Sequence, residues 1–242
     1  MVVGFTGVTS GQTKSKEFYE LRVYEMRMGP ALSNLEKFFS SALIPALNRN
    51  GVKKVGVFRE MGKSEPPKVY LLIPYPSIEE YGKVLKALDR DEEFQQARKE
   101  YDQLPVDRPV YDRFESSLMI AFDGLPQMIA PENKPRIFEL RTYEGYSEDA
   151  VRRKVKMFNE GEFDIFFRTK LNPVFFGEVI SGKGLPCLTY MITFSNMEER
   201  DANWKAFGSD PAWQKISKDP QYANTVSKII RVFLEPTSYS QL

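Results

Sequence analysis

The sequence predicts an α+β fold in which two tandem β-α-β-β-α-β units pack sheet to sheet as a closed or nearly closed barrel. Three observations lead to this prediction. The chain repeats itself at an offset of 119 residues, and each copy alternates strand-like and helix-like segments in the same order. In addition, 42% of the residues are apolar, which is ample for a packed core.

The repeat is clearest in two matching octapeptides. Residues 18–25 read FYELRVYE and residues 137–144 read IFELRTYE. The same offset, followed over residues 17–114 without a gap, gives 20 identical pairs. Average composition would give about six. A tandem duplication therefore organises the chain.

Strand-like and helix-like segments follow one another within each copy. In the first copy, β-branched and aromatic residues predict strands, and apolar residues at helical spacing predict a helix after the first strand. The expected strands are 19–24, 55–59, 69–73 and 111–115, and the expected helix is 31–50. Pro45 should kink or break this helix.

Four residues are expected to begin helices in the second half of the units. Ser77 and Asn196 each stand three residues before a glutamate, as in a capping box, and Asp91 and Asp210 are N-cap candidates. A unit of this order forms a four-stranded antiparallel sheet with helices on one face. Two copies can cover the remaining faces by packing them together.

The repeat also predicts the boundaries of the units. We expect a disordered or leader-like N-terminus at 1–16, a first unit at 17–115, a connector at 116–136, a second unit at 137–235 and a C-terminal tail at 236–242. Prolines and a glycine predict a loop in the connector, with its apolar residues packed on the body. The N-terminus lacks a basic start, so two compartments stay open: the cytoplasm, or an exported, periplasmic location if a signal peptide begins upstream.

Composition excludes several kinds of chemistry. Without histidine the chain has no Ser-His-Asp triad, no Cys-His pair, no histidine-ligated haem and no ordinary zinc site. The single cysteine, Cys187, is expected to be a small buried hydrophobe. A formal charge of +1 removes the electrostatic argument for nucleic acid. We expect no cofactor, no metal site and, because every apolar run is strand-sized, no membrane span.

The ELR-x-Y-E opening of both copies, followed by an aromatic-bearing helix, resembles the NIPSNAP family. The resemblance covers residues 17–115 and 136–235. It implies the dimeric α+β-barrel superfamily, in which two ferredoxin-like units pair through their sheets; here the pair would be intramolecular. That superfamily includes cofactor-independent monooxygenases and haem-handling enzymes, and the lack of histidine separates this chain from the haem branches. Some bacterial double-unit members of the family look exported.

The opening strand of each unit supplies candidate ligand-binding residues on one face. They are Glu20, Arg22, Tyr24, Glu139, Arg141 and Tyr143. We expect the opposite face, with Leu21 and Val23, to meet the helices, so that the polar face points into the barrel. An arginine there could bind an anionic or carbonyl group with its planar fork. Alternatively, an Arg–Glu pair within or across the two sheets could fix their register.

Other charged and aromatic residues have simpler explanations. Glu178 stands where the first unit has Arg59, an exchange that indicates either an asymmetric site or an exposed strand residue. Trp204 and Trp213 are expected in the core. The basic residues between 152 and 156 are expected on the solvated face of a helix.

Two functions remain open from the sequence. The first is binding of a small molecule or a protein partner through the tandem barrel. The second is a cofactor-independent monooxygenase-like or isomerase-like enzyme acting on a small organic substrate, in which tyrosine, arginine and glutamate would move the protons. The expected partners are a small-molecule ligand and a second copy of the chain in a homodimer.

Overall fold

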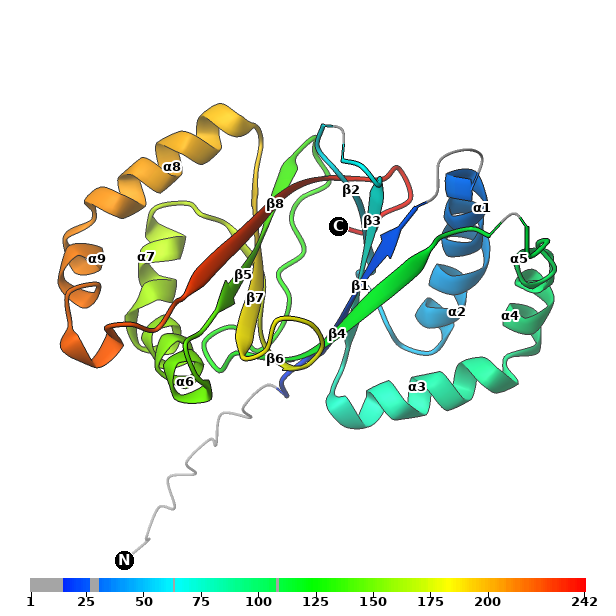
Figure 1. The fold of residues 1–242 in the computed structure, drawn as a ribbon, viewed down its shortest axis with the longest axis horizontal. Helices are drawn as coiled ribbons and strands as arrows, with labels where there is room; N and C mark the ends of the chain where they lie inside the picture. Colours follow the sequence, from blue (N-terminus) through cyan, green and yellow to red (C-terminus); the bar gives the residue numbers. More distant parts are fainter. Residues whose placement is uncertain (1–14, 27–30, 63, 108) are drawn as a thin grey trace, which may run out of the picture.

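The computed structural model describes residues 15–26, 31–62, 64–107 and 109–242, and the chain passes twice through one order of elements (Figure 1). The first passage is β1 (Phe18–Glu25), α1 (Ala31–Phe38), the π-helix η1 (Phe39–Leu43), α2 (Ile44–Arg49), β2 (Gly56–Glu60), β3 (Lys68–Tyr75), α3 (Ile78–Arg90), α4 (Glu92–Ala97), α5 (Lys99–Asp102) and β4 (Arg113–Ala121). The second is β5 (Ile137–Glu144), α6 (Glu148–Met157), the π-helix η2 (Phe158–Glu162), α7 (Phe163–Arg168), β6 (Pro173–Ser181), β7 (Cys187–Phe194), α8 (Met197–Ser209), α9 (Pro211–Ile216), the 3-10 helix η3 (Pro220–Tyr222) and β8 (Lys228–Pro236). The expectation for residues 1–16 lies almost wholly outside the described residues.

The duplication recurs in the structure, element by element. The segments η1, α2, β3, α3 and α4 begin and end 119 residues before η2, α7, β7, α8 and α9. The closing strands β4 and β8 are separated by 115 residues instead, because the second copy is four residues shorter before its last strand. Positions in the two repeats can therefore be compared one by one.

Eight strands close into a barrel in the order β1-β3-β2-β8-β5-β7-β6-β4. All neighbours are antiparallel, and the helices of each repeat lie outside its own four strands, on opposite flanks of the molecule (Figure 1). The two halves meet along short seams, with three residue pairs between β2 and β8 and four between β4 and β6. The α+β class and the closed barrel expected from the sequence are confirmed.

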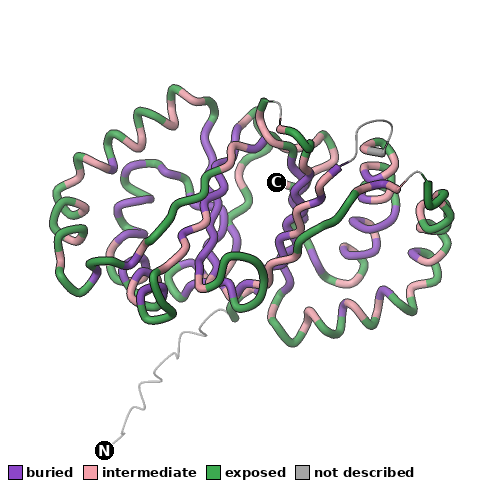
Figure 2. Tube along the Cα trace, viewed as in Figure 1, coloured by how far each residue is buried: buried purple, intermediate pink, exposed green. Residues whose placement is uncertain are grey.

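Side chains from both repeats fill the barrel interior, and the buried ones are apolar except for threonines such as Thr189 and Thr193 on β7. The apolar ones include Tyr19, Leu21, Phe58, Leu72, Phe138, Leu140, Met191 and Leu234. Each half of the barrel has one further apolar cluster, which lies between its strands and its own helices. Burial is accordingly concentrated in the strands and on the inward faces of the helices (Figure 2). The barrel core thus joins the repeats into one body.

The orientation expected for the opening strands is wrong. Leu21 belongs to the barrel interior and Val23 packs against it, whereas Tyr24 packs beside Phe39 of η1. The Glu-Arg-Tyr faces of β1 and β5 therefore point towards the helices. A closed barrel surrounds its interior on all sides, so a polar group there would be cut off from water. The layer between sheet and helices offers it partners instead.

The connector between the repeats is more ordered than the loop expected for residues 116–136. Its first six residues complete β4. Beyond the strand, the backbone N–H groups of Phe122 and Ile129 donate to the carbonyls of Phe176 and Val174 on β6, at 3.2 and 2.9 Å. Phe122 is also buried, as are Leu125 and Met128. The connector thus binds the first repeat to the second.

The C-terminal tail makes the reciprocal crossing. The N–H groups of Thr237 and Gln241 each donate over 2.9 Å, to the carbonyls of Val57 and Val55 respectively. These are the positions in the first repeat that correspond to Phe176 and Val174. Each repeat therefore ends in a segment that is hydrogen-bonded to the region of the second strand of the other repeat, next to a short seam of the barrel.

Local helix signals are confirmed where the sequence predicts them. Ser77 and Asn196 accept hydrogen bonds from the backbone three residues later, and Asp91 and Asp210 cap α4 and α9. Pro45 lies in the first turn of α2, directly after η1. The second repeat has a π-helix at the same place without a proline, so the break in this helix does not depend on Pro45.

Candidate functional site

Glu20 is buried at the centre of a saturated hydrogen-bond cluster in the first repeat. Arg22 donates to both of its carboxylate oxygens, at 2.7 and 2.9 Å. The hydroxyl groups of Tyr75 and Ser116 donate to it at 3.1 and 2.9 Å. Each carboxylate oxygen thus has two donors. The remaining candidate of this strand, Tyr24, stacks on Phe114 with ring centroids 4.9 Å apart.

Glu139 occupies the equivalent place in the second repeat with a different set of donors. Arg141 donates at 2.7 Å, Arg200 of α8 at 2.8 and 3.1 Å, and the indole of Trp204 at 3.1 Å. Burial alone would raise the pKa of the Glu139 carboxyl, but the hydrogen bond from Arg200 and the charges of Arg141 and Arg200 outweigh burial and lower it. In both repeats the Arg–Glu pair lies within one strand and does not bridge the two sheets.

Arg141 is only partly used by this network. Its guanidinium carbon lies 4.5 Å from the centroid of the Trp204 ring and 5.4 Å from that of Tyr143. Its Nε atom is buried and has no hydrogen-bond partner among the described residues. An unpaired buried donor is costly, by about 1–3 kcal/mol.

A second buried ion pair lies in the same layer, and one of its members, Lys154, belongs to the basic run expected on a solvated face. The Nζ atom of Lys154 on α6 lies 2.7 Å from Oε1 of Glu162 in η2, and the two residues are only 5% and 2% exposed. The ammonium group also faces the rings of Phe158, Trp213 and Tyr143, at 4.6, 5.6 and 5.9 Å. The basic run therefore has one member turned into the core, because Lys154 lies one turn after Val151 on the buried face of α6.

Glu162 is unusual for a buried carboxylate because its Oε2 atom has no hydrogen-bond partner among the described residues. Burial raises the pKa of the Glu162 carboxyl, and the positive charge of Lys154 opposes this only in part. The first repeat has Leu35 and Leu43 at the two equivalent positions, both in its apolar core. The sequence did carry a signal for this pair: at both positions one repeat has a charged residue where the other has leucine.

The strand register aligns the candidate residues into rows on the helix-facing side. One row runs Tyr143, Leu188, Glu178 across β5, β7 and β6, and the next runs Arg141, Tyr190, Phe176. The hydroxyl groups of Tyr143 and Tyr190 lie 2.7 Å apart, which couples the two rows. Tyrosine, arginine and the buried ion pair are therefore contiguous in the second repeat.

A pocket of about 330 Å³ lies where α6 begins beside the β6–β7 turn. We call it the α6–β6 pocket. Its lining includes Glu148, Val151, Glu178, Ile180, Leu185 and Pro186. Val151 also belongs to the aromatic core cluster that contains Tyr143 and Tyr190. The first repeat has a pocket of about 300 Å³ at the corresponding place, lined among others by Leu32, Arg59 and Pro67.

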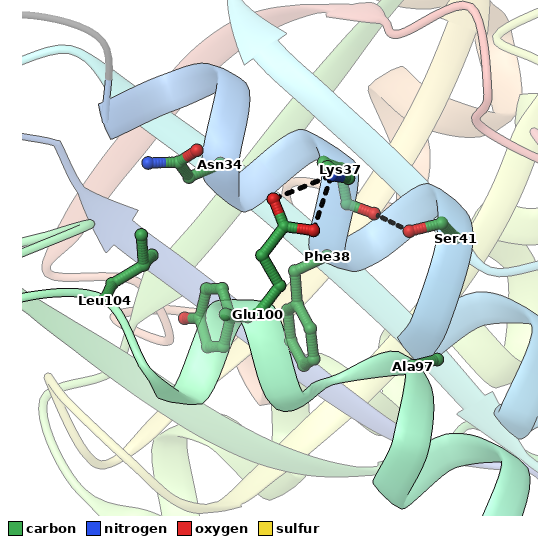
Figure 3. Close-up of a pocket in the computed structure, with 8 residues that line it drawn as sticks. Asn34, Lys37, Phe38, Ser41, Ala97, Glu100 and Leu104 are labelled. Atoms are coloured by element: carbon green, nitrogen blue, oxygen red, sulfur yellow. Dashed lines mark hydrogen bonds and ion pairs between the residues drawn. The ribbon is translucent and has the colours of Figure 1, made fainter.

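Two further features carry less chemistry. A pocket between α1 and α5 has a volume of about 30 Å³, room for a single water, and an ion pair from Lys37 to Glu100 at 2.7 Å spans it (Figure 3). Within the described residues, no group of three acidic or cysteine side chains could hold a metal ion. Nor does any helix in the described part of the chain have the length and apolarity needed to cross a membrane.

A closed barrel of eight antiparallel strands with outer helices, whose polar residues lie between sheet and helix, defines an α+β-barrel protein. Within that class the chain belongs to the NIPSNAP family, whose sequence profile matches residues 19–112 and 138–241. The two matches correspond to the two repeats. No protein of curated function matches the sequence.

Solved structures share the fold of the whole chain. A monooxygenase candidate from Lactobacillus acidophilus NCFM superposes with a TM-score of 0.59 at 8% identity, over 92% of this chain and 94% of its own. One from Fusobacterium nucleatum gives 0.56 at 9% identity, over 92% and 93%. A NIPSNAP family protein from Agrobacterium tumefaciens is 18% identical, with a TM-score of 0.41, over 48% of this chain and 97% of its own. At these identities the two full-length matches describe the fold alone.

Proposed function

We propose that this protein binds a small organic molecule in the α6–β6 pocket of the second repeat. The observation that carries the proposal is the pocket itself, whose lining combines apolar side chains with charged ones; the free Oε2 atom of Glu162 lies in the same layer between sheet and helices of this repeat. Such an atom in a native structure calls for a water or a ligand group that the protein itself does not supply. The unpaired Nε of Arg141 in the same layer supports the same conclusion.

The shape and lining of the pocket agree with this function. Its volume of about 330 Å³ lies at the lower end of the range for small-molecule sites. Val151, Ile180, Leu185 and Pro186 give it an apolar wall, and charged groups stand at its edge. Apolar side chains that hold the body of a ligand, together with polar groups that fix its orientation, are typical of sites for small organic ligands.

We infer further that residues 17–115 and 137–235 are two ferredoxin-like units and that the barrel is their intramolecular dimer. The coincidence of element bounds at one offset supports this organisation. Since Glu20 is fully hydrogen-bonded and positions 35 and 43 are leucine, the first unit acts as the scaffold. The second unit, with unpaired polar atoms in its core, holds the ligand.

Native mass spectrometry of the protein as purified, compared with the denatured sample, tests the proposal. We expect excess mass in the native spectrum only, and its loss in Leu185→Trp, where a large side chain fills the pocket. Leu185 is 48% exposed, so the fold should tolerate the change. Ile78→Trp, at a residue 47% exposed on α3, is the matched control and should retain the mass. Equal retention by both variants would reject the α6–β6 pocket as the site.

A second candidate function, a cofactor-independent monooxygenase-like or isomerase-like enzyme, is favoured by the carboxylates of Glu148 and Glu178 in the lining of the pocket. A carboxylate within hydrogen-bond reach of a bound substrate can take a proton from it and return it. The ligand found by mass spectrometry would be the substrate to assay, with O2 supplied as the oxidant in the monooxygenase case. Glu178→Gln should then abolish turnover while the ligand is still bound.

Self-association remains a prediction. The apolar connector residues Phe122, Leu125 and Met128 are buried within their own chain and do not offer a surface for a second copy. Ile229 and Ile230 on β8 are the exposed apolar residues that a second copy would cover. The same native spectra give the number of copies, and a single copy at micromolar concentration would contradict a homodimer.

A further inference from the structure

The pockets of the two repeats differ in charge at one matching position. In the first repeat, Arg59 on β2 forms an ion pair with Glu36 on α1. The equivalent positions in the second repeat hold Glu178 on β6 and Val155 on α6. The second repeat therefore has the opposite charge on the strand and an apolar residue in place of the partner on the helix.

Glu178 is left without a partner by this exchange. No hydrogen bond or ion pair joins it to any residue that the structure describes, although it is only partly exposed. Glu148, at the other side of the pocket, is likewise unpaired within the described part of the chain. The cation that lines the pocket, Arg152, donates at 3.3 Å to Asp149, which lies outside the pocket lining. Two carboxylates without partners thus line the pocket together with one cation, Arg152, that is paired outside it.

Glu148 has a structural explanation that Glu178 lacks. As the first residue of α6, Glu148 interacts favourably with the positive end of the helix dipole. Glu178 lies in a strand, opposite Leu188, in the row that continues to Tyr143. Two strand spacings, about 9–10 Å, separate it from Tyr143. No hydrogen bond or ion pair within the described residues explains a carboxylate at this position, and Glu178 lines the pocket.

We propose that the α6–β6 pocket selects organic cations: amines whose ammonium group pairs with Glu178 and whose apolar body lies against Val151, Ile180 and Leu185. Glu148 adds to the negative potential at the mouth. This inference rests on the proposed function, because it specifies the ligand class of the same pocket. The first repeat, where Arg59 already has an acidic partner, lacks this selectivity.

Three probes of one length test the proposal: n-hexylamine as the cation, 1-hexanol as the neutral molecule and hexanoate as the anion, compared by ligand-observed NMR on the full chain. We expect hexylamine to bind about fivefold more tightly than hexanol, because a partly exposed ion pair contributes about 1 kcal/mol. Hexanoate should bind more weakly than either. Added salt should weaken hexylamine binding and leave hexanol unchanged.

Variants assign the preference to Glu178. Glu178→Gln should remove the advantage of hexylamine and keep hexanol binding. The double variant Glu178→Arg, Val155→Glu installs the ion pair of the first repeat. It should also remove the advantage of hexylamine, without leaving an unpaired charge in the pocket. Glu198→Gln removes one negative charge on the exposed first turn of α8 and serves as the control; it should change nothing.

The outcomes separate this inference from the proposed function. Equal binding of hexylamine and hexanol, unaffected by Glu178→Gln, overturns the selection of cations while the pocket stands as a ligand site. Binding of none of the three probes, with no retained mass in native spectra, overturns both. An amine preference that survives Glu178→Gln overturns the assignment to Glu178.

Discussion

Lys154 and Glu162 form an ion pair inside the second repeat, with 2.7 Å between Nζ and Oε1, where the first repeat has Leu35 and Leu43. Both charges are desolvated, and one carboxylate oxygen stays unpaired. Desolvation of two charges often costs more than their attraction returns. A pair of this kind is therefore a poor source of stability, and the first repeat has an apolar core at the same positions.

The first prediction concerns the stability of this pair. Lys154→Leu or Glu162→Leu alone should destabilise the fold by about 3–5 kcal/mol, because one charge stays buried without its partner. The double variant, which installs the residues of the first repeat, should be as stable as the parent protein or more stable by about 1–4 kcal/mol. Urea unfolding measures all three. Arg152→Leu on the exposed face of α6 is the control and should stay within about 0.5 kcal/mol. A double variant as unstable as the singles would mean that the pair supports the fold.

The second prediction compares the two opening strands. Arg22→Met removes both hydrogen bonds from the cation beside the buried Glu20, and should cost about 3–5 kcal/mol. Arg141→Met should cost clearly less, because Glu139 keeps Arg200 and Trp204 as donors. Unfolding free energies of the two variants, measured side by side, check the order. Equal costs, or the reverse order, would show that Arg200 does not hold Glu139 in solution.

The third prediction is a dependence of stability on pH. The hydrogen bond and charge of Arg168, together with the backbone N–H groups of Ala212 and Trp213, lower the pKa of Asp210 from 3.8 to about 2. A carboxyl group whose pKa is lower in the folded state adds stability above its unfolded pKa and loses it as pH falls. Stability should therefore fall between about pH 4 and pH 2.

Asp210→Asn tests this assignment, since asparagine retains the helix cap but has no charge to titrate. The variant should show a shallower loss of stability over the same pH interval. Asp89→Asn, on the exposed surface of α3, is the control and should keep the slope of the parent protein. An unchanged slope in Asp210→Asn would assign the acid sensitivity to other carboxylates.

The fourth prediction concerns the tail that crosses to β2. The side chains of Ser240 and Gln241 accept hydrogen bonds from the backbone N–H groups of Val57 and Val55, at 3.0 and 2.9 Å. Changing both to alanine should cost about 1–3 kcal/mol, because these donors lie at a strand edge that water reaches only in part. The exposed Ser238→Ala is the control. Thermal unfolding with no difference between the two proteins would show that the tail does not hold the seam.

Much of the fold could be predicted from residues close together in the sequence. Ser77, Asn196, Asp91 and Asp210 act as caps because capping depends on a side chain and a backbone group within a few residues of each other. The duplication was readable for a similar reason: identical residues at a constant offset require no knowledge of contacts. Both kinds of information are local or internal to the sequence.

The candidate site was predicted only in part. Glu20, Arg22 and Tyr24 do share a face, because strand alternation has a period of two. Alternation does not say which face turns inward, and that was settled by the closure of eight strands around an apolar interior. The pocket, and the row of side chains from Tyr143 to Glu178 across the sheet, depend on strand register, which brings together residues far apart in the chain.

The sequence by itself determined the repeat, the order of elements, the caps and the lack of histidine chemistry. Only the tertiary structure decided that Lys154 is buried beside Glu162 and that the polar strand faces meet the helices. It also decided that the last segment of each repeat is hydrogen-bonded to the other repeat. The physical reason is that burial and partnership depend on contacts between segments. A charged residue on a helix looks solvated in the sequence until packing shows what covers it.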